Sequence, residues 1–391
     1  MKEQGGYSMK HMIFALSASM IIGFYVAQFI SNMIISESIP SHSIQEQKRN
    51  NNFSLRTCTN PHSVPDHPVD NSIVADQLKK EVRILCWIMT NPNNHKNKSR
   101  HIKRTWGKRC NILLFMSSEY DDELPTVKLD VEEGRVNLWR KVKEAFKYVY
   151  KHHYNDADWF YKADDDTYAI MENLRYMLYP YHPMTPVHFG CKFKAYVKQG
   201  FMAGGPGYVL SKEALRRLVV EGIPNNKLCR NETNEFEDVE IGRCLEKLNV
   251  IAGDSRDWNG RGRMFPFIPE QHLLPDKNMS YWYWSVIFYQ TDEGLDCCSD
   301  NAISFHYIDP KMMYAFEYLI YQLRPYGIVR EPHRLPAKLN VGEFLPPPIE
   351  EVADSNEDSV DDDDRLMKTS TSRSAVIEPN SSEVNIRKLG N

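Results

Sequence analysis

Short apolar runs bounded by turn residues mark the first part of a folded domain. Residues 82–89 (VRILCWIM) form one run, which ends in a Thr-Asn-Pro turn, and residues 111–117 (NILLFMS) form another. An apolar run of this length that stops at a turn is typical of a buried strand. The basic stretch between them, residues 98–106, is compatible with a helix. The pattern therefore predicts a strand, helix, strand unit of an α/β domain.

A second helix and strand lead into a cluster of acids. Residues 138–150 (LWRKVKEAFKYVY) have apolar positions three to four apart, which predicts a helix. Residues 158–162 (DWFYK) predict a short strand that runs into Asp164, Asp165 and Asp166. Ligands of open α/β sheets collect at the carboxyl ends of strands, so a site is expected at these acids.

Further elements complete the predicted α/β fold class. Residues 203–210 (AGGPGYVL) read as a glycine-rich turn and the start of a strand, and residues 211–221 as a helix. Another helix is expected to begin at Glu237 and Asp238. Carboxylates favour helix N-termini, so a purely structural role for these two acids is also open.

The N-terminus predicts a membrane anchor. Residues 12–30 (MIFALSASMIIGFYVAQFI) are almost wholly apolar and follow Lys2 and Lys10. This length is close to the roughly 20 residues that cross a bilayer as a helix, and the preceding lysines place the short end in the cytoplasm. We expect a cytoplasmic tail over 1–11 and a type II signal anchor over 12–35. A cleaved signal peptide is the alternative, although its apolar region would be shorter.

Composition changes twice more along the chain. Residues 36–75 are polar and aperiodic, as expected of a stem, and a catalytic domain is expected over 76–345. Residues 346–391 begin with three prolines and are rich in Asp and Glu, which predicts a disordered acidic tail. Calcium binding is the alternative role for the tail, but no fixed ligand loop is visible in it.

The eight cysteines indicate disulfides in an oxidising compartment, because they lack the paired spacing of zinc sites. The neighbours Cys297 and Cys298 are expected to bond to two different partners. Asn-x-Ser/Thr sequons permit the same compartment and occur at Asn52, Asn97, Asn231, Asn278 and Asn380. The net charge of −4 and the pI of about 6.4 argue against nucleic acid as a partner.

The acidic triplet has a specific chemical use. Transfer of a sugar from a nucleotide requires that the diphosphate leaving group be neutralised, which a divalent cation held by carboxylates can do. Asp164 and Asp166, one residue apart at a strand end, are suited to hold such a cation. The bare D-x-D pattern is weak evidence, because acidic triplets are more often exposed turns.

The triplet lies in a longer segment with a family resemblance. Residues 156–168 (DADWFYKADDDTY) resemble the metal-binding segment of the core 1 β-1,3-galactosyltransferases of glycosyltransferase family 31. Further matches follow the same order and cover roughly residues 80–330: 100–106 (RHIKRTW), 204–211 (GGPGYVLS), 237–242 (EDVEIG) and 297–307 (CCSDNAISFHY). This last segment, with 253–257 (GDSRD) and 323–327 (LRPYG), points to the core 1 group.

The resemblance implies a GT-A fold, which is a Rossmann-like α/β domain with a mostly parallel sheet, and an inverting mechanism. It implies manganese (Mn2+) as cofactor, UDP-galactose as donor and the 3-hydroxyl of GalNAc on Ser or Thr of glycoproteins as acceptor. It also implies a Golgi membrane location with a luminal catalytic domain, and a homodimer. By the same resemblance Asp166 and His306 ligate the metal, Asp164 supports the site and Asp165 faces the ribose.

The remaining roles divide between donor and acceptor. A carboxylate must deprotonate the acceptor hydroxyl, and we expect Asp238 to do so, with Glu237 as its rival. The residues expected at the donor are Thr90, Asn93, Arg104, Lys141, Gly204, Gly205 and Tyr307. Trp282 and Trp284, in the aromatic run 281–284, could stack on the acceptor sugar, but a core role is equally open.

Two other functions stay open. An enzyme with the same fold could transfer another UDP-sugar, such as N-acetylglucosamine or glucuronic acid. A non-catalytic chaperone is the second possibility, since the core 1 group includes such a relative. That relative is expected to lack the acidic triplet, whereas this chain has it together with His306.

Overall fold

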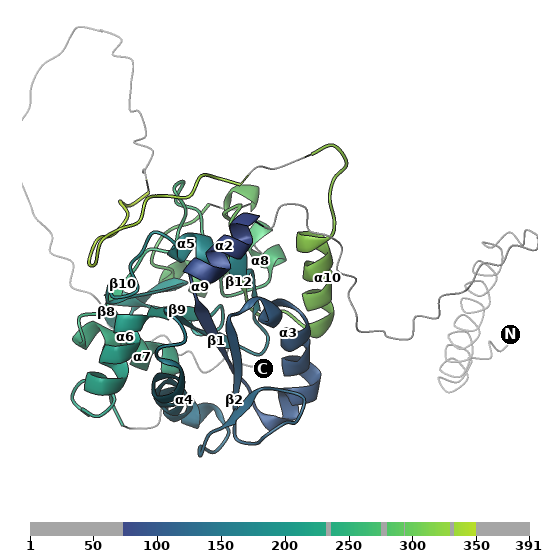
Figure 1. Cartoon of the computed structure of the whole chain (residues 1–391). Coiled ribbons are helices and arrows are strands. Elements are labelled where there is room, and N and C mark those ends of the chain that lie inside the picture. Colours follow the sequence, from purple (N-terminus) through teal and green to yellow (C-terminus); the bar gives the residue numbers. More distant parts are fainter. Residues whose placement is uncertain (1–72, 232–235, 275–279, 293, 329–331, 349–391) are drawn as a thin grey trace, which may run out of the picture. The chain divides into compact units, whose positions relative to one another are not determined.

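A seven-stranded sheet is the centre of the computed structural model, which describes residues 73–231, 236–274, 280–292, 294–328 and 332–348 (Figure 1). Its strands are β1 (Ile84–Met89), β2 (Ile112–Ser117), β3 (Thr126–Lys128), β4 (Trp159–Asp164), β6 (Val187–Gly190), β9 (Tyr208–Ser211) and β10 (Ile251–Ala252). The spatial order is β10-β6-β9-β4-β1-β2-β3. Only β9 runs antiparallel to its neighbours, β4 and β6. The predicted α/β class with a mostly parallel sheet is confirmed.

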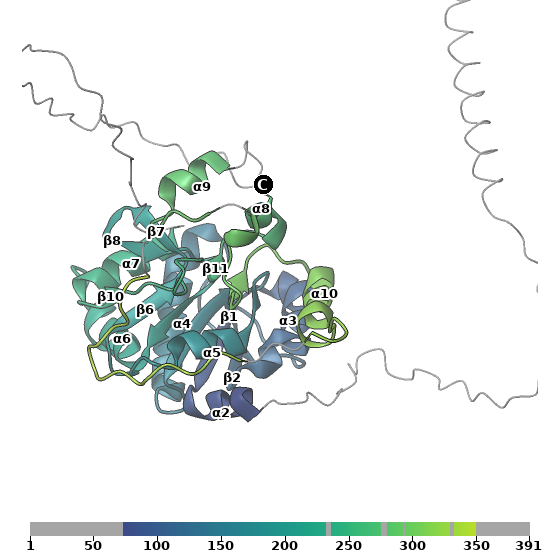
Figure 2. The same ribbon diagram turned by 90° about the horizontal axis from the view of Figure 1, so that it is seen from above.

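Both faces of the sheet are buried under helices, as the views in Figures 1 and 2 show. The longer helices are α2 (Ile73–Glu81), α4 (Leu138–His153), α5 (Met171–Leu178), α7 (Glu237–Lys247) and α10 (Pro310–Tyr321). Shorter ones are α3 (Arg100–Arg104), α6 (Lys212–Arg216), α8 (Pro269–Leu273) and α9 (Ser280–Val286). Side chains of α4, α6 and α7 share one apolar cluster, and side chains of α3, α5 and α10 share another.

Alternation along β1 explains why its sequence is continuously apolar. Ile84, Cys86 and Ile88 belong to one cluster, whereas Leu85 and Trp87 belong to the other. Successive side chains of a strand point to opposite faces of the sheet, so a strand covered on both sides must be apolar at every position. This arrangement confirms that the runs over 82–89 and 111–117 are strands.

The predicted helices are confirmed with two differences. The helix expected over 211–221 is α-helical only in α6 and continues as a π-helical segment (Arg217–Gly222). The helix expected over 138–150 is α4, and α7 begins at Glu237 as expected. The stretch over 98–106 does not form one helix, because a π-helical turn (His95–Ser99) precedes α3 and a 3-10 turn (Trp106–Arg109) follows it. At the break, the Thr105 hydroxyl donates a hydrogen bond of 2.7 Å to the carbonyl oxygen of His101. Such a side-chain hydrogen bond competes with the regular hydrogen bonds of the helix backbone.

Two smaller sheets lie beside the central one. One contains β5 (Tyr168–Ala169), β11 (Met264–Phe265) and β12 (Ser304–Phe305), in the order β11-β12-β5. The other is the antiparallel pair β7 (Lys192–Ala195) and β8 (Val197–Met202). The first is important for function, because β12 pairs with the strand that directly follows the acidic triplet.

Disulfides join Cys86 to Cys110 and Cys229 to Cys244. Cys297 and Cys298 are bonded to each other, so the expectation of two different partners is wrong. Among the described cysteines the remaining one, Cys191, is free and buried in the core. Sequence spacing could not show this, since it carries no information on which sulfurs meet.

The predicted terminal segments fall largely outside the described residues. No helix within the described part of the chain is long and apolar enough to cross a membrane, and the expected anchor over 12–35 lies beyond that part. Helix α2 begins at Ile73, inside the range expected for the stem. Of the expected acidic tail, only 346–348 are described.

A buried ionic network fastens α10 to the rest of the domain. Glu317 of α10 accepts two hydrogen bonds from the Arg109 guanidinium, at 2.7 and 2.9 Å, and a third from the Tyr168 hydroxyl at 2.8 Å. The guanidinium carbon also lies 3.5 Å from the ring centroid of Tyr321. Glu317 is 4% exposed. Its charge is therefore balanced almost entirely by protein groups.

Glu317→Ala is expected to lower the free energy of unfolding by roughly 3 kcal/mol, because it removes the closest carboxylate partner of the largely buried Arg109 charge, which keeps only the longer 3.8 Å contact to Glu172 among its described ion pairs. Thermal and urea unfolding would measure the loss. Glu144→Ala is the control, since Glu144 pairs with Lys147 on the exposed side of α4 and should cost less than about 0.5 kcal/mol. Equal effects of the two substitutions would contradict a structural role for the Glu317 network.

Candidate active site

The acidic triplet lies at the carboxyl end of β4, near the middle of the large sheet. Asp164 is the last residue of β4 and pairs in register with Met89, the last residue of β1. Thr90, which follows Met89, therefore lies beside the triplet. Parallel strands that end together leave room for a ligand at their common edge, so the predicted location of the site agrees with the fold.

Asp165 faces the end of β1. Its Oδ2 accepts hydrogen bonds from Thr90 Oγ1 and Asn94 Nδ2, both at 2.8 Å. Burial raises the pKa of Asp165, and the nearby Lys98 and these hydrogen bonds oppose that rise. Asp165 and Thr90, both predicted near the donor nucleoside, are thus in direct contact.

His306 reaches the triplet from β12. Its Nε2 lies 3.0 Å from Asp166 Oδ1 and 3.8 Å from Asp164 Oδ2. The backbone on both sides is fixed, because His306 N donates to Phe265 O at 3.1 Å and Ile308 N to Asp166 O at 2.8 Å. Asp164, Asp166 and His306 can each offer one ligand atom, and those atoms lie within 4.8 Å of one another.

Lys98 is a cationic partner of two residues of the triplet, Asp165 and Asp166. Its Nζ lies 2.9 Å from Asp166 Oδ2 and 3.4 Å from Asp165 Oδ1. Burial would raise the pKa of Asp166, but the hydrogen bonds and charges of His306 and Lys98 outweigh it and hold the pKa well below its usual range. Asp166 is therefore ionised, as a metal ligand must be.

The glycine-rich turn lies against both the histidine and the predicted base. A Cβ on Gly205 would overlap the imidazole ring of His306. A Cβ on Gly204 would come within 2.7 Å of Glu237 Oε1. Close approach of backbone to side chains requires glycine at both positions. The structure thus places Gly204 and Gly205 at the site, in contact with protein side chains.

Glu237 and Asp238 have different environments although they are adjacent. Both Glu237 oxygens are occupied, one by Lys162 Nζ at 3.0 Å and the other by the Tyr208 hydroxyl at 3.2 Å. Asp238 is half-buried and accepts a hydrogen bond from Gly204 N at 3.2 Å. Burial raises the pKa of Asp238, against backbone N–H donors that lower it. Asp238 is the more available of the two carboxylates.

The other predicted donor residues are less closely gathered. Lys141 is buried, and its Nζ donates to the Thr90 carbonyl and to Glu133 at 2.7 Å. Asn93 is exposed, whereas its neighbour Asn94 makes the contact with Asp165. Arg104 is exposed at the end of α3 and forms no hydrogen bond or ion pair with the residues that the structure describes.

An aromatic chain connects α9 with His306. The rings of Trp282 and Phe267 meet edge to face with centroids 5.6 Å apart, and Phe267 stacks with Tyr307 at 6.4 Å. The Tyr307 ring lies 4.0 Å from that of His306. Trp282 and Trp284 are only partly buried and pack on the core, so each keeps some surface that a sugar could contact.

The sequence reading missed three residues that contact the acids: Asn94, Lys98 and Lys162. The sequence does contain a signal for the contact of Lys162 with Asp164. It precedes Asp164 by two positions in a strand, and side chains two apart share one face of a sheet. A lysine on the same face as a candidate ligand, within a buried strand, predicts a direct charge pair. Asn94 ends a short 3-10 helix and Lys98 lies in the π-helical turn that follows, and neither segment has the 3.6-residue period of an α-helix.

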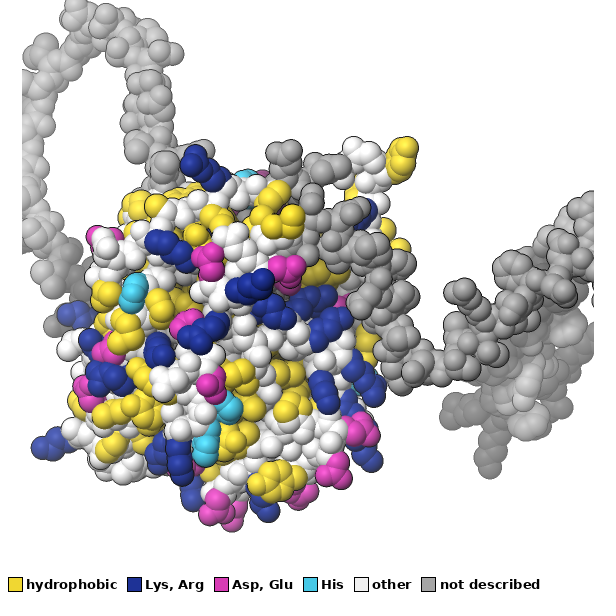
Figure 3. Space-filling model, in the orientation of Figure 1, with side chains coloured by type: hydrophobic (Ala, Val, Ile, Leu, Met, Phe, Trp, Pro, Cys, Tyr) yellow, Lys and Arg dark blue, Asp and Glu magenta, His cyan; other side chains and the backbone are white. Residues whose placement is uncertain are grey.

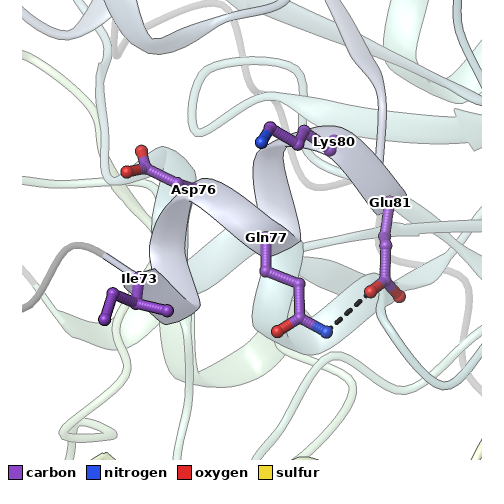
Figure 4. Close-up of a pocket in the computed structure, with 5 residues that line it drawn as sticks. All are labelled: Ile73, Asp76, Gln77, Lys80 and Glu81. Carbon is purple, nitrogen blue, oxygen red and sulfur yellow. Dashed lines mark hydrogen bonds between the residues drawn. The ribbon is translucent and has the colours of Figure 1, made fainter.

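The pocket along α2 contains no comparable cluster of reactive side chains among the residues that the structure describes. A pocket of about 460 Å³ is lined by Ile73, Asp76, Gln77, Lys80 and Glu81, all from α2 (Figure 4). Within this pocket the Gln77 side-chain amide donates a hydrogen bond of 2.7 Å to the Glu81 carboxylate. On the face shown in Figure 3, charged side chains of both signs are interspersed with hydrophobic ones.

Parts of the chain are similar to known proteins. A family model described as Fringe-like matches residues 79–285, more than half of the chain, and this range includes the triplet, the glycine turn and Asp238. The chain is 52% identical over 262 residues to glycoprotein-N-acetylgalactosamine 3-beta-galactosyltransferase 1 of Xenopus laevis, which covers 66% of this chain and 72% of that protein.

More distant relatives match a smaller part of this chain. A beta-1,3-glucosyltransferase of Mus musculus is 28% identical over 211 residues, 53% of this chain and 42% of that protein. Chondroitin sulfate synthase 3 of Homo sapiens is 29% identical over 198 residues, 46% of this chain and 22% of that protein. All three relatives are named for the transfer or synthesis of sugars. The chain therefore belongs to the Fringe-like glycosyltransferases and, within them, to the core 1 β-1,3-galactosyltransferases whose motifs it carries.

Proposed function

We propose that this protein transfers galactose from UDP-galactose to the 3-hydroxyl of GalNAc that is α-linked to Ser or Thr of glycoproteins. The observation that carries the proposal is the convergence of Asp164, Asp166 and His306 with the glycine turn that holds Asp238. The name of the Xenopus relative, at 52% identity, supports this donor sugar and acceptor. The complete acidic site favours an enzyme over a non-catalytic chaperone.

The site suits a divalent cation such as manganese. Two carboxylates and one imidazole form a mixed oxygen and nitrogen ligand set, and the absence of a side chain at Gly205 leaves the imidazole the room it needs. Asp164, Asp166 and His306 would hold the ion, which would neutralise the diphosphate of the departing UDP. Thr90, Asn94 and Asp165 would bind the nucleoside at the end of β1.

Asp238 would act as the general base. It takes the proton of the acceptor 3-hydroxyl as that oxygen bonds to the anomeric carbon, and the bond between this carbon and UDP breaks on the opposite face. The burial that raises the pKa of Asp238 makes it a stronger base than an exposed aspartate. Glu237 is less suited to this role, because it is 6% exposed and paired with the Lys162 cation, whereas Asp238 is half-buried and accepts hydrogen bonds from the backbone N–H groups of Gly204 and Val239.

The location and assembly of the protein are part of the proposal. The apolar segment over 12–35 would anchor the chain in the Golgi membrane as a type II protein with its catalytic domain in the lumen. The disulfides are consistent with an oxidising compartment. A homodimer remains an expectation from the family resemblance.

The direct test is transfer by the purified full chain to a GalNAc-Ser/Thr glycopeptide, with a panel of UDP-sugars, with and without manganese. Galactose transfer that requires the metal is the expected result. Preference for another UDP-sugar would replace the donor in the proposal. A folded protein that transfers no sugar would leave the chaperone as the better function.

Asp238→Asn is expected to lower kcat by roughly 10²–10⁴-fold, because it removes the base and keeps the shape of the side chain. Binding of UDP with manganese, measured by calorimetry, should be retained. Asp156→Asn is the matched control, since Asp156 is exposed and pairs with His153 in the turn before β4. Substantial turnover by the Asp238 variant would rule out this residue as the base.

Gly205→Ala is expected to weaken manganese binding by about tenfold or more, because the new methyl group displaces the His306 imidazole and so removes one ligand. Electron paramagnetic resonance of free manganese would measure the affinity with and without UDP. An unchanged affinity would mean that His306 does not ligate the ion.

Trp282→Ala is expected to raise the KM for the glycopeptide more than the KM for UDP-galactose, because the rings of Phe267 and Tyr307 separate the indole from His306 and the acids. Steady-state kinetics with each substrate varied in turn would separate the two. Equal changes in both constants would indicate that Trp282 only supports the fold.

A further inference from the structure

Lys162 is a fully buried cation with three partners in the site. It is 2% exposed, and its Nζ lies 2.7 Å from Asp164 Oδ1, 3.0 Å from Glu237 Oε1 and 3.1 Å from the Gly204 carbonyl oxygen. An ammonium group has three N–H donors, and here three acceptors surround it. The side chain therefore has one arrangement in which all its donors are satisfied.

The three acceptors come from three separate parts of the site. Asp164 ends β4 and belongs to the candidate metal ligands. Glu237 is the first residue of α7, immediately before Asp238. Gly204 lies in the turn before β9, and its N–H donates to Asp238 Oδ2. The Lys162 ammonium group thus connects the metal-binding edge of the sheet to Gly204, which contacts Asp238, and to Glu237, which precedes it.

We infer that Lys162 is a positioning residue for sugar transfer, which sets where Asp238 stands relative to Asp164 and the rest of the metal-binding group. This inference rests on the proposed function. It assigns a structural task to Glu237, whose carboxylate anchors the start of α7 through Lys162 and Tyr208. The base is then fixed from two sides, by the helix start and by Gly204.

The glycine turn packs closely against this link. A single methyl group on Gly204 would come within 2.7 Å of Glu237 Oε1 and 3.3 Å of Lys162 Nζ. The turn therefore holds its place only because position 204 is glycine and position 162 supplies a cation that both the turn and Glu237 contact. A neutral side chain at position 162 would consequently let the turn and the helix start move apart from β4.

The test compares Lys162→Met with the double variant Lys162→Met/Glu237→Gln in the full chain. The single variant leaves Glu237 charged and buried, and its Tm is expected to fall by roughly 10 °C. The double variant removes that charge and should recover most of the Tm. Both should lose kcat on the order of 100-fold, because a base displaced by about 1 Å costs that much. UDP binding with manganese should persist, because Asp166 and His306 do not touch Lys162 and because Asp164, the candidate ligand that does, is retained in both variants.

Arg175→Met is the matched control. Arg175 is 1% exposed, and its guanidinium donates to Val82 O, Arg109 O and Asn111 Oδ1, none of which is in the site. This variant should lose Tm as Lys162→Met does, but keep the wild-type kcat below its Tm. If it loses kcat equally, destabilisation alone explains the Lys162 result and the inference is overturned.

Two further outcomes decide the matter. Recovery of kcat together with Tm in the double variant would mean that Lys162 only balances charge. A crystal structure of the double variant should show Asp238 moved away from Gly204 N, and an unmoved Asp238 would overturn the inference without any reference to activity. A wild-type protein that transfers no sugar would instead refute the proposed function, and the crystallographic comparison would still stand as a test of positioning.

Discussion

Repulsion between carboxylates is the constraint on which this site depends. Five acids lie around the carboxyl end of β4: Asp164, Asp165, Asp166, Glu237 and Asp238. Two lysines, Lys98 and Lys162, contact members of this group. Like charges repel strongly where burial lowers the dielectric, and each lysine here is shared between two carboxylates. A divalent cation would add to this compensation at the exposed side, while Lys162 provides it at the buried side.

The topology of the sheet brings distant residues to that edge. Strand β9 runs antiparallel to β4, with Tyr208 opposite Lys162, so the turn that precedes β9 falls at the carboxyl end of β4. Strand β12 pairs antiparallel with β5, with Phe305 opposite Tyr168, which places His306 next to Asp166. One antiparallel pairing in the large sheet and one in the neighbouring three-stranded sheet thus assemble the turn and the histidine.

The difference between Glu237 and Asp238 shows how environment divides roles between adjacent acids. Glu237 is held by a cation and a phenol and serves as an anchor. Asp238 accepts backbone N–H groups and keeps a carboxylate with a raised pKa. Burial raises the pKa of both carboxylates, so their roles are divided by their different hydrogen-bond partners and exposure. The helix start that favours both acids electrostatically does not by itself distinguish them.

Local pattern was sufficient to predict the α/β class, the strands over 82–89 and 111–117, the helix over 138–150 and the acids at a strand end, because period and turn chemistry are properties of adjacent residues. The broken helix near Thr105 and the bond between Cys297 and Cys298 could not be read in this way. Contacts between segments far apart in the chain were decided only by tertiary structure. Asn94 contacts Asp165, whereas Asn93, which was expected at the donor, is exposed. Lys162 meets Glu237 across 75 positions, because strand order and direction determine which side chains become neighbours.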